Sequence, residues 1–299
     1  YVLVYGKVLD WYNDRSIRTV SFVAIIFGCV FFYLEKGRNS HYMLLDVLRL
    51  RTIRLGVLLY LLLMIFNSSA MFVNVFTGIG MKLDNYQNAT LGNWCMAGYA
   101  IGALSSMFLG SKGVHFKYLF AAGFLFLGLS AVFMYFEVQS AGLYERMKYP
   151  VIIRTTGMMF LYALTAAYAT QRMPYKYLST WICVMLTVRM VLGPSIGGAI
   201  YSNVLQERQQ HYIVRYAQNV DMLHPEASAS FIQTMQGMQY QGKSKQEALN
   251  MAAPSTKGRI QVQATLSAVK EMAGWTIYGC LFCMIFVLII PYPKRKLLT

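Results

Sequence analysis

Residues 178–202 read LSTWICVMLTVRMVLGPSIGGAIYS, an almost unbroken run of apolar side chains. A helix rises about 1.5 Å per residue and a bilayer core is about 30 Å thick, so about 20 apolar residues are enough to cross it. A bilayer offers no water to unsatisfied backbone groups, and a segment that spans it alone must therefore be helical. The stretch predicts a membrane-spanning helix.

Six further stretches have the same character and cover 17–34, 55–76, 91–111, 118–138, 150–170 and 271–291. Apolar residues make up 57% of the chain and charged residues 13%, whereas soluble domains carry about 25% charged residues. The mean hydropathy is +0.43. The sequence predicts an all-α polytopic membrane protein with seven transmembrane helices, of which the last six form one bundle.

The charge distribution predicts the orientation of these helices. A net charge of +15 would indicate a nucleic-acid partner in a soluble protein, but here the basic residues lie mainly in the hinges between apolar stretches. If the tail 292–299 is cytoplasmic, the inside hinges hold twelve Lys and Arg against seven in the short outside segments. This bias follows the positive-inside rule. We therefore expect a cytoplasmic C-terminus, the lipid bilayer as a partner, and no nucleic acid.

The sequence offers little to an enzyme. The four His lie in hinges or in the long polar insert, and the twelve carboxylates lie outside the spans or at their edges. A zinc-protease HExxH and a phosphate-binding Gly-Lys-Ser loop are both missing from the sequence. Cys280 and Cys283 form a CxxC on an apolar helix, where packing is the ordinary role of cysteine. We therefore expect no catalytic residue, no metal site and no cofactor. A membrane-bound acyl- or glycosyltransferase would need a polar catalytic cluster at an interface, and the sequence shows none.

The pattern divides the chain into five parts. Residues 1–16 resemble the end of a missing span and a periplasmic turn, so we expect an N-terminal portion to precede Tyr1. A helix at 17–35 and a basic cytoplasmic connector at 36–54 follow. The bundle occupies 55–291, and the basic tail occupies 292–299.

The bundle contains one long extracytoplasmic insert, 205–268. We predict a helix from Pro225 to Gln241 in this insert. Ser244 and Glu247 form a capping-box pattern, which predicts a second, short helix that Pro254 ends. The insert is either a solvated cap or a docking surface for a partner protein.

Arg189 is the residue most open to a functional interpretation. It lies about 18 Å along its helix from the end near Tyr177, and an arginine at that depth must face a cavity or a partner. It is either a structural pair between helices or a charge that lines a transport path. Pro194 interrupts the backbone hydrogen bonds just beyond it, and Gly193, Gly197 and Gly198 are expected to let a neighbouring helix pack closely.

Other polar residues at membrane depth extend this candidate path. Asn67 and Asn74 lie in the outer half of the second span, at a spacing that suits the lining of an interior. Arg154 and Tyr162 lie on the fifth span, although Arg154 is also near enough to the outer interface to extend to water. We predict a substrate path that includes Arg189, Asn67, Asn74, Arg154 and Tyr162.

Together these features resemble the C-terminal half of a major facilitator superfamily transporter of the fourteen-span drug/proton antiporter type, the EmrB/QacA-like multidrug exporters. Val8-Leu-Asp-Trp-Tyr-Asn13 resembles the LDWF-type turn between the two extra central spans of that family. Arg189-Met-Val-Leu-Gly-Pro-Ser-Ile-Gly-Gly198 resembles the penultimate helix, where an Arg precedes a glycine-rich run. The long insert before the last span is also a trait of the EmrB-like members.

The resemblance implies a function as well as a fold. The helix at 17–35 would be an extra central helix, and 55–291 the C-terminal bundle, completed by a missing N-terminal half. The full protein would exchange protons for an amphipathic substrate by rocking two bundles about a midplane site. It would lie in a bacterial cytoplasmic (inner) membrane and meet a periplasmic adaptor and an outer-membrane channel.

Two points stay open at this stage. Arg189 and Glu271 would make a gating or coupling pair across the last two spans if the helices bring them together. The alternatives to a multidrug exporter are a metabolite importer or exchanger on the same fold, or a membrane sensor or scaffold that transports nothing.

Overall fold

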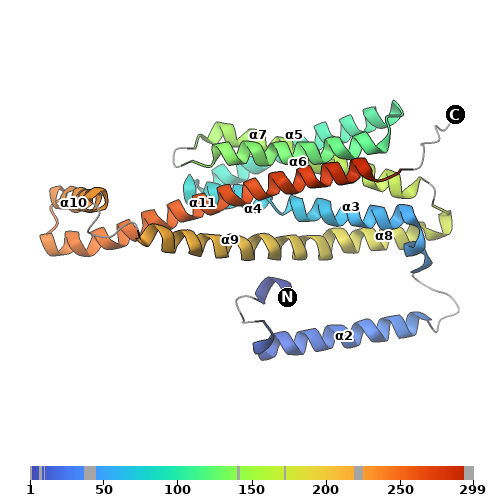
Figure 1. Ribbon diagram of the computed structural model, residues 1–299, viewed down its shortest axis with the longest axis horizontal. Coiled ribbons are helices and arrows are strands. Elements are labelled where there is room, and N and C mark those ends of the chain that lie inside the picture. Colours follow the sequence, from blue (N-terminus) through green and yellow to red (C-terminus); the bar gives the residue numbers. More distant parts are fainter. Residues whose placement is uncertain are drawn as a thin grey trace.

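The structure is a computed structural model, and every regular element in its described part is a helix (Figure 1). The described residues are 2–6, 9, 11–36, 45–139, 142–171, 173–218 and 225–292. Six helical stretches of this part are long and apolar enough to cross a membrane. They are Arg15–Glu35, Arg51–Gly80, Phe116–Glu137, Tyr144–Thr170, Tyr175–Gln218 and Lys245–Ile289. This all-helical architecture fits a polytopic membrane protein.

The seventh predicted span, 91–111, lies on α5 (Asn85–Ser111), a 27-residue helix that is not among the six. Asn, Gly and Ser lower the mean apolarity of α5. Its outer face nevertheless exposes large apolar side chains such as Met96, Leu104 and Met107. The role of α5 as a membrane span stays a prediction.

Six helical segments lie side by side in one bundle (Figure 1). Four of its helices are α5, α6 (Phe116–Glu137), α7 (Tyr144–Thr170) and α11 (Lys245–Ile289). The first segment of the bundle joins α3 (Arg51–Asn67), α4 (Ala70–Val75) and the π-helical turn η3 (Phe76–Gly80). The fifth joins α8 (Leu178–Thr187), the π-helical turn η5 (Val188–Leu192) and α9 (Gly193–Gln218). Helix α3 packs against both α7 and α9, so it lies between the two.

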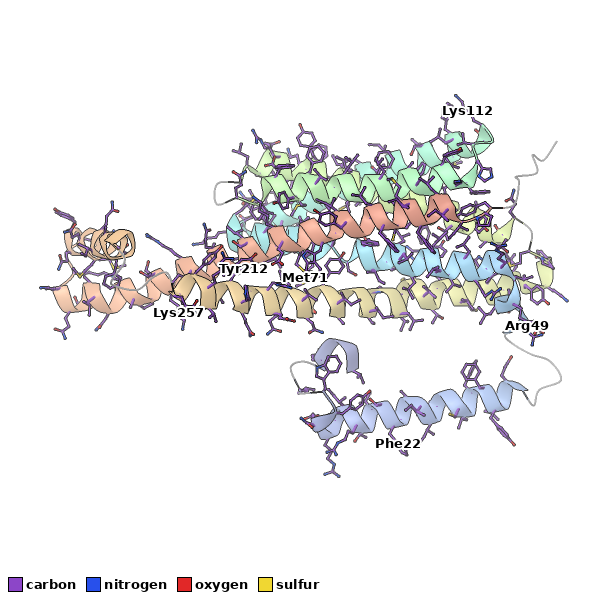
Figure 2. The ribbon with its side chains drawn as sticks, viewed as in Figure 1. Phe22, Arg49, Met71, Lys112, Tyr212 and Lys257 are labelled. Atoms are coloured by element: carbon purple, nitrogen blue, oxygen red, sulfur yellow. The ribbon has the colours of Figure 1, made fainter. Side chains whose placement is uncertain are left out.

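Helix α2 (Arg15–Lys36) lies apart from the bundle, after α1 (Val2–Tyr5) and the 3₁₀ turn η1 (Trp11–Asn13) (Figure 1). Its Phe22 and Phe27 side chains are 66% and 71% exposed, and Figure 2 shows Phe22 on this separate helix. A row of exposed aromatic side chains needs lipid or further protein around it. Within the predicted turn Val8–Asn13, Val8 and Asp10 lie outside the described residues.

The hinges that were predicted to be cytoplasmic share one end of the bundle. Figure 2 places Arg49 and Lys112 at this end and Lys257 at the opposite one. In the connector 36–54, residues 37–44 lie outside the described part, and a 3₁₀ turn, η2 (Leu45–Arg49), leads directly into α3. Of the basic tail, 293–299 lie outside the described residues.

The described part of the insert, 205–218 and 225–268, is mostly helical, and one of the breaks predicted for it is wrong. Helix α10 runs over Pro225–Tyr240, close to the prediction, and the capping box forms, with the Glu247 N–H donating to Ser244 Oγ at 3.3 Å. However, α11 does not end at Pro254 and continues without interruption to the far end of the bundle. Both Pro254 and Asn250 are exposed, so water can satisfy the Asn250 carbonyl that the proline leaves without a donor.

The long α11 joins the insert to the bundle. Its 45 residues make a helix of about 67 Å, which exceeds a bilayer core. Hydrogen bonds tie its first half to α9, from Gln209 Nε2 to Thr265 Oγ1 at 2.7 Å and between Tyr216 and Ser267 at 2.7 Å. The insert therefore continues the bundle as a stiff extension, with α10 packed on its end (Figure 1).

Glycines set the closest contacts of the bundle. On α5, Gly98 and Gly102 face α7, where a Cβ atom on either would lie 2.6 Å from a backbone carbonyl, that of Ile152 or of Thr156. Any larger residue would push the two helices apart. The α5–α7 contact is therefore held at backbone distance.

Candidate functional site

Arg189 lies on the π-helical turn η5, which joins α8 to α9 about 18 Å along the helix from Tyr177. The N–H of Gly193 donates to the carbonyl of Val188, five residues back, which is the register of a π-helix. Pro194 follows and has no N–H to donate, so it supplies no hydrogen bond to the carbonyls of this turn. The predicted disturbance around Pro194 is therefore a π turn that carries Arg189, a feature common at functional positions.

The Arg189 side chain is held by Tyr162 of α7. Its Nη1 donates to the Tyr162 hydroxyl, and the guanidinium carbon lies 4.2 Å from the centre of the tyrosine ring. The fully buried Tyr60 of α3 completes the contact, because its hydroxyl donates to the Tyr162 carbonyl at 3.1 Å. Arg189 and Tyr162, predicted separately for the path, are thus brought together.

A second arginine occupies the same interface further along. Arg154 of α7 donates from Nη1 to the side-chain oxygen of Asn67 at 2.8 Å and to the Asn67 carbonyl at 3.4 Å. That carbonyl is available because α3 ends at Asn67, and the N–H of Met71 bonds Ser68 instead, at 3.1 Å. The side chain of Arg154 therefore reaches the centre of the second span rather than the outer interface.

The two arginine sites are aligned. Tyr60 and Asn67 are seven residues apart on α3, and Arg154 and Tyr162 are eight apart on α7, so each pair is separated by about two helical turns, or 10–12 Å. We call Tyr60, Asn67, Arg154, Tyr162 and Arg189 the polar row. It runs along the contact between α3 and α7.

The polar row has no acidic member. The ion pairs among the described residues are Asp46–Arg49, Glu137–Arg146, Glu145–Lys148 and Glu271–Arg208. Neither Arg154 nor Arg189 takes part in any of them. Two cationic side chains at membrane depth are thus balanced only by neutral groups of the described chain, an arrangement that is expensive without a functional reason.

Glu271 and Arg189 do not form the pair that was predicted. The carboxylate of Glu271 lies 3.5 Å from Arg208 Nη1, and the Arg208 guanidinium lies 5.3 Å from the Trp275 ring centre. These residues tie α9 to α11 near the insert, whereas Arg189 turns to α7. Arg208, the partner of Glu271, lies 19 residues beyond Arg189, or about 28 Å along the helix, so Glu271 is too far from Arg189 for a direct pair.

Two of the three glycines that were expected to allow close packing lie against α3, namely Gly193 and Gly197. A Cβ on Gly193 would clash with Met64 of α3, and one on Gly197 would lie 3.0 Å from the Ile65 Cα and closer still to the Ser68 hydroxyl. Gly198 has nothing within 4 Å, and Pro194 is exposed. The backbones of α9 and α3 therefore approach each other through Gly193 and Gly197.

A small polar cavity opens beside Arg154. It holds about 170 Å³ and lies between α4, α5 and α7. Asn74 lines it together with Asn88 and Cys95 of α5, and the place of Asn74 on a substrate path stays a prediction. Cys95 and Arg154 face the same cavity. The cavity can offer hydrogen bonds and a positive charge to a small polar group.

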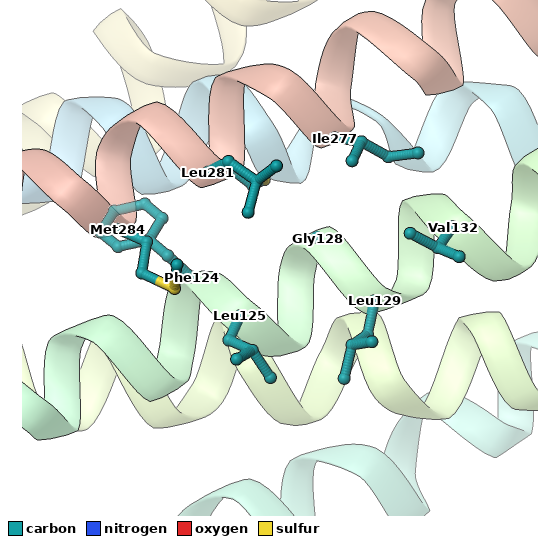
Figure 3. Close-up of a pocket in the computed structure, with 9 residues that line it drawn as sticks. Phe124, Leu125, Gly128, Leu129, Val132, Ile277, Leu281 and Met284 are labelled. Atoms are coloured by element: carbon teal, nitrogen blue, oxygen red, sulfur yellow. The ribbon is translucent and has the colours of Figure 1, made fainter.

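A second cavity is apolar. It lies between α6 and α11 and holds about 190 Å³ (Figure 3). Phe124, Gly128 and Val132 line it from α6, and Ile277 and Leu281 from α11. Gly128 leaves the space open because it has no side chain. With no hydrogen-bonding side chain in its lining except the Cys280 thiol, this cavity suits hydrocarbon alone.

Sequence reasoning missed several of these residues. Tyr60 sits in an apolar run whose tyrosine has no distinctive pattern, and Asn88 precedes the predicted start of its span. Cys95 was not among the predicted site residues. The signal that was available is spacing, because Tyr60 and Asn67 share a helical face two turns apart.

Searches against models of known protein families and against curated proteins found no match for this chain. Groups of three or more metal-ligating side chains are likewise not found among the described residues. The physical arrangement of the polar row is therefore the basis for a functional assignment.

Proposed function

We propose that this chain is the C-terminal half of a secondary active transporter, a proton-coupled exporter of drugs or other amphipathic compounds. The observation that carries the proposal is Arg189, a charge about 18 Å along a helical segment that is long enough to cross a membrane, on a π turn and without an acidic partner among the described residues. Ionisable residues at such depth mark substrate or ion pathways in membrane proteins.

The helices around Arg189 support movement. The fifth segment changes from α-helical to π-helical hydrogen bonding at η5. The first segment is interrupted after Asn67 and has its own π-helical turn at η3. Interrupted helices near the midplane, lining a polar interior, are typical of transporters that alternate their access. Substrate export with proton exchange comes from the sequence resemblance.

The proposed membrane is the bacterial cytoplasmic membrane, with the C-terminus in the cytoplasm. Arg49 and Lys112 lie at the same end of the bundle (Figure 2), which supports a single cytoplasmic face. The stiff extension formed by α9, α10 and α11 would then project outward, and we propose it as the contact for a periplasmic adaptor and an outer-membrane channel.

The test is transport by the full-length protein in proteoliposomes under an imposed pH gradient. Fluorescent amphipathic cations and anions serve as substrates, and an uncoupler as the control. We expect flux that collapses with the uncoupler and falls by at least about tenfold in Arg189→Ala, since a charged hydrogen bond contributes about 1.5–3 kcal/mol. Cys280→Ala, which changes the wall of the apolar cavity, serves as the matched variant with unchanged flux.

The outcomes separate the alternatives. Flux of a metabolite without any amphipathic compound favours an importer or exchanger on the same fold. No flux over the panel, with correctly folded and oriented protein, favours a sensor or scaffold and contradicts the proposal.

A further inference from the structure

Arg154 is satisfied on one side only. Its Nη1 donates to Asn67 at 2.8 Å, whereas its Nε is buried and has no hydrogen-bond partner. A buried donor on a charged group costs free energy when nothing accepts its hydrogen bond. The guanidinium therefore keeps one donor that no acceptor among the described residues satisfies.

The neighbouring cavity can hold an anion beside this guanidinium. Arg154 lines it together with two amide side chains, Asn74 and Asn88, and the thiol of Cys95. Its volume of about 170 Å³ is below the range of about 300–1,000 Å³ for pockets that enclose a drug-sized molecule. It is sufficient for one small charged group and the beginning of its stem.

The sign of the charge is set by the surroundings. Arg154 belongs to none of the ion pairs of the described residues, and the side chains that line the cavity include no carboxylate. A cation in this space would meet an uncompensated positive charge, whereas an anion would neutralise it in a region of low dielectric.

We propose that this cavity binds the anionic head group of an amphipathic compound, a carboxylate or a sulfonate, with Arg154 as the counter-charge and Asn74 and Asn88 as hydrogen-bond donors. The identity of this compound as a transported substrate rests on the proposed function. The binding itself does not.

Cys95 supplies a direct test, because its thiol lies in the lining. In full-length protein whose other cysteines are replaced by alanine, Cys95 is modified with two methanethiosulfonates of similar size, one carrying a sulfonate and one a trimethylammonium. Each rate is divided by the rate of the same reagent with a free small thiol. A cavity of one charge sign concentrates counter-ions about tenfold or more, so we expect the anionic reagent to be favoured by at least about tenfold.

Two variants show whether Arg154 causes the preference. Arg154→Gln is expected to abolish it, and Arg154→Lys to preserve it. If Arg154→Gln does not fold, as judged by gel filtration, the Arg154→Lys variant and the original still provide the ratio. Equal normalised rates in the original protein would overturn the proposal, as would a preference that survives in folded Arg154→Gln.

The second arm identifies the source of the anion. Octanoate is expected to protect Cys95 from a neutral maleimide, whereas octylammonium at the same concentration does not. A preference for the anionic reagent without protection by octanoate would mean that Arg154 attracts anions to Cys95 but does not hold the head group of a free amphipathic compound, and it would overturn the proposed binding. This assay needs no pH gradient, so it is independent of the transport test. Octanoate protection without proton-driven flux would reject the proposed transport and leave the anion site standing. Proton-driven flux without octanoate protection would reject the anion site and leave the proposed transport standing.

Discussion

Helix α7 packs on its two neighbours in opposite ways. Toward α5 it meets Gly98 and Gly102, and the backbones touch. Toward α3 it presents Arg154 and Tyr162, whose polar atoms bond Asn67 and Tyr60 across the contact. One side is closed by the removal of side chains and the other is held apart by large polar ones.

The difference separates stability from function. Without a hydrophobic effect inside lipid, close packing of small residues is the main source of attraction between helices. The α5 side has this packing and no room to change. The α3 side carries charged side chains whose burial at membrane depth costs free energy. Such side chains are typical of functional sites in membrane proteins. The polar row is therefore the side of α7 to test for function, and the α5 side the one to test for stability.

The largest effect is expected from Gly98→Leu. The new side chain must displace Thr155 and the backbone of Ile152, and overpacking a well-packed core costs about 1–3 kcal/mol or more even for added methylenes. We expect loss of most folded protein, measured as the monodisperse fraction after heating in detergent.

Gly28→Leu is the matched control, because Gly28 lies on the separate helix α2 with nothing within 4 Å. It should leave the monodisperse fraction unchanged. A Gly98→Leu protein as stable as Gly28→Leu would show that the α5–α7 contact does not hold the bundle together.

A smaller effect, on binding rather than folding, is expected from Asn67→Asp. The aspartate supplies Arg154 with the carboxylate it lacks and forms a charge-assisted hydrogen bond. We expect the preference of Cys95 for the anionic reagent to fall by about tenfold, without loss of stability.

Asn67→Leu makes the comparison specific to charge. It removes the acceptor at 2.8 Å and should cost about 1–3 kcal/mol of stability, yet it should preserve the anionic preference. An unchanged preference in Asn67→Asp would mean that Asn67 and the cavity do not share the same guanidinium.

The two sides of α7 also differed in how far the sequence predicted them. Apolar length alone predicted the all-helical class and the position of the helices, because a lipid-spanning segment has one solution for its backbone. The segment 91–111 is less apolar than the other predicted spans. Its helix α5 packs on α7 through glycine contacts, and no local sequence pattern identifies α7 as the partner. Pro254 was wrongly expected to end a helix, because exposure of that turn to water is a tertiary property.

The site was predicted as a set of residues and not as contacts. Arg189, Arg154, Asn67, Asn74 and Tyr162 were selected for their polarity at membrane depth. Their pairing depends on how α3, α7 and the η5 turn are rotated, which a single sequence does not determine. The expected pair of Arg189 with Glu271 rested on charge alone. In the structure Glu271 forms its ion pair with Arg208 of α9 instead.

The smallest effect is expected within the polar row itself, from Tyr60→Phe. Its hydroxyl donates at 3.1 Å to the carbonyl of Tyr162, which α7 already uses in its own helix, so no acceptor is left unsatisfied. The T-shaped ring contact with Tyr162, with centres 5.4 Å apart, remains. We expect a loss of about 1 kcal/mol in unfolding free energy and unchanged flux.

Tyr162→Phe, by contrast, leaves the Arg189 guanidinium without its hydroxyl acceptor and should lower the flux. Equal flux in the two variants would show that the tyrosines only pack, and that Arg189 needs no partner on α7 to act.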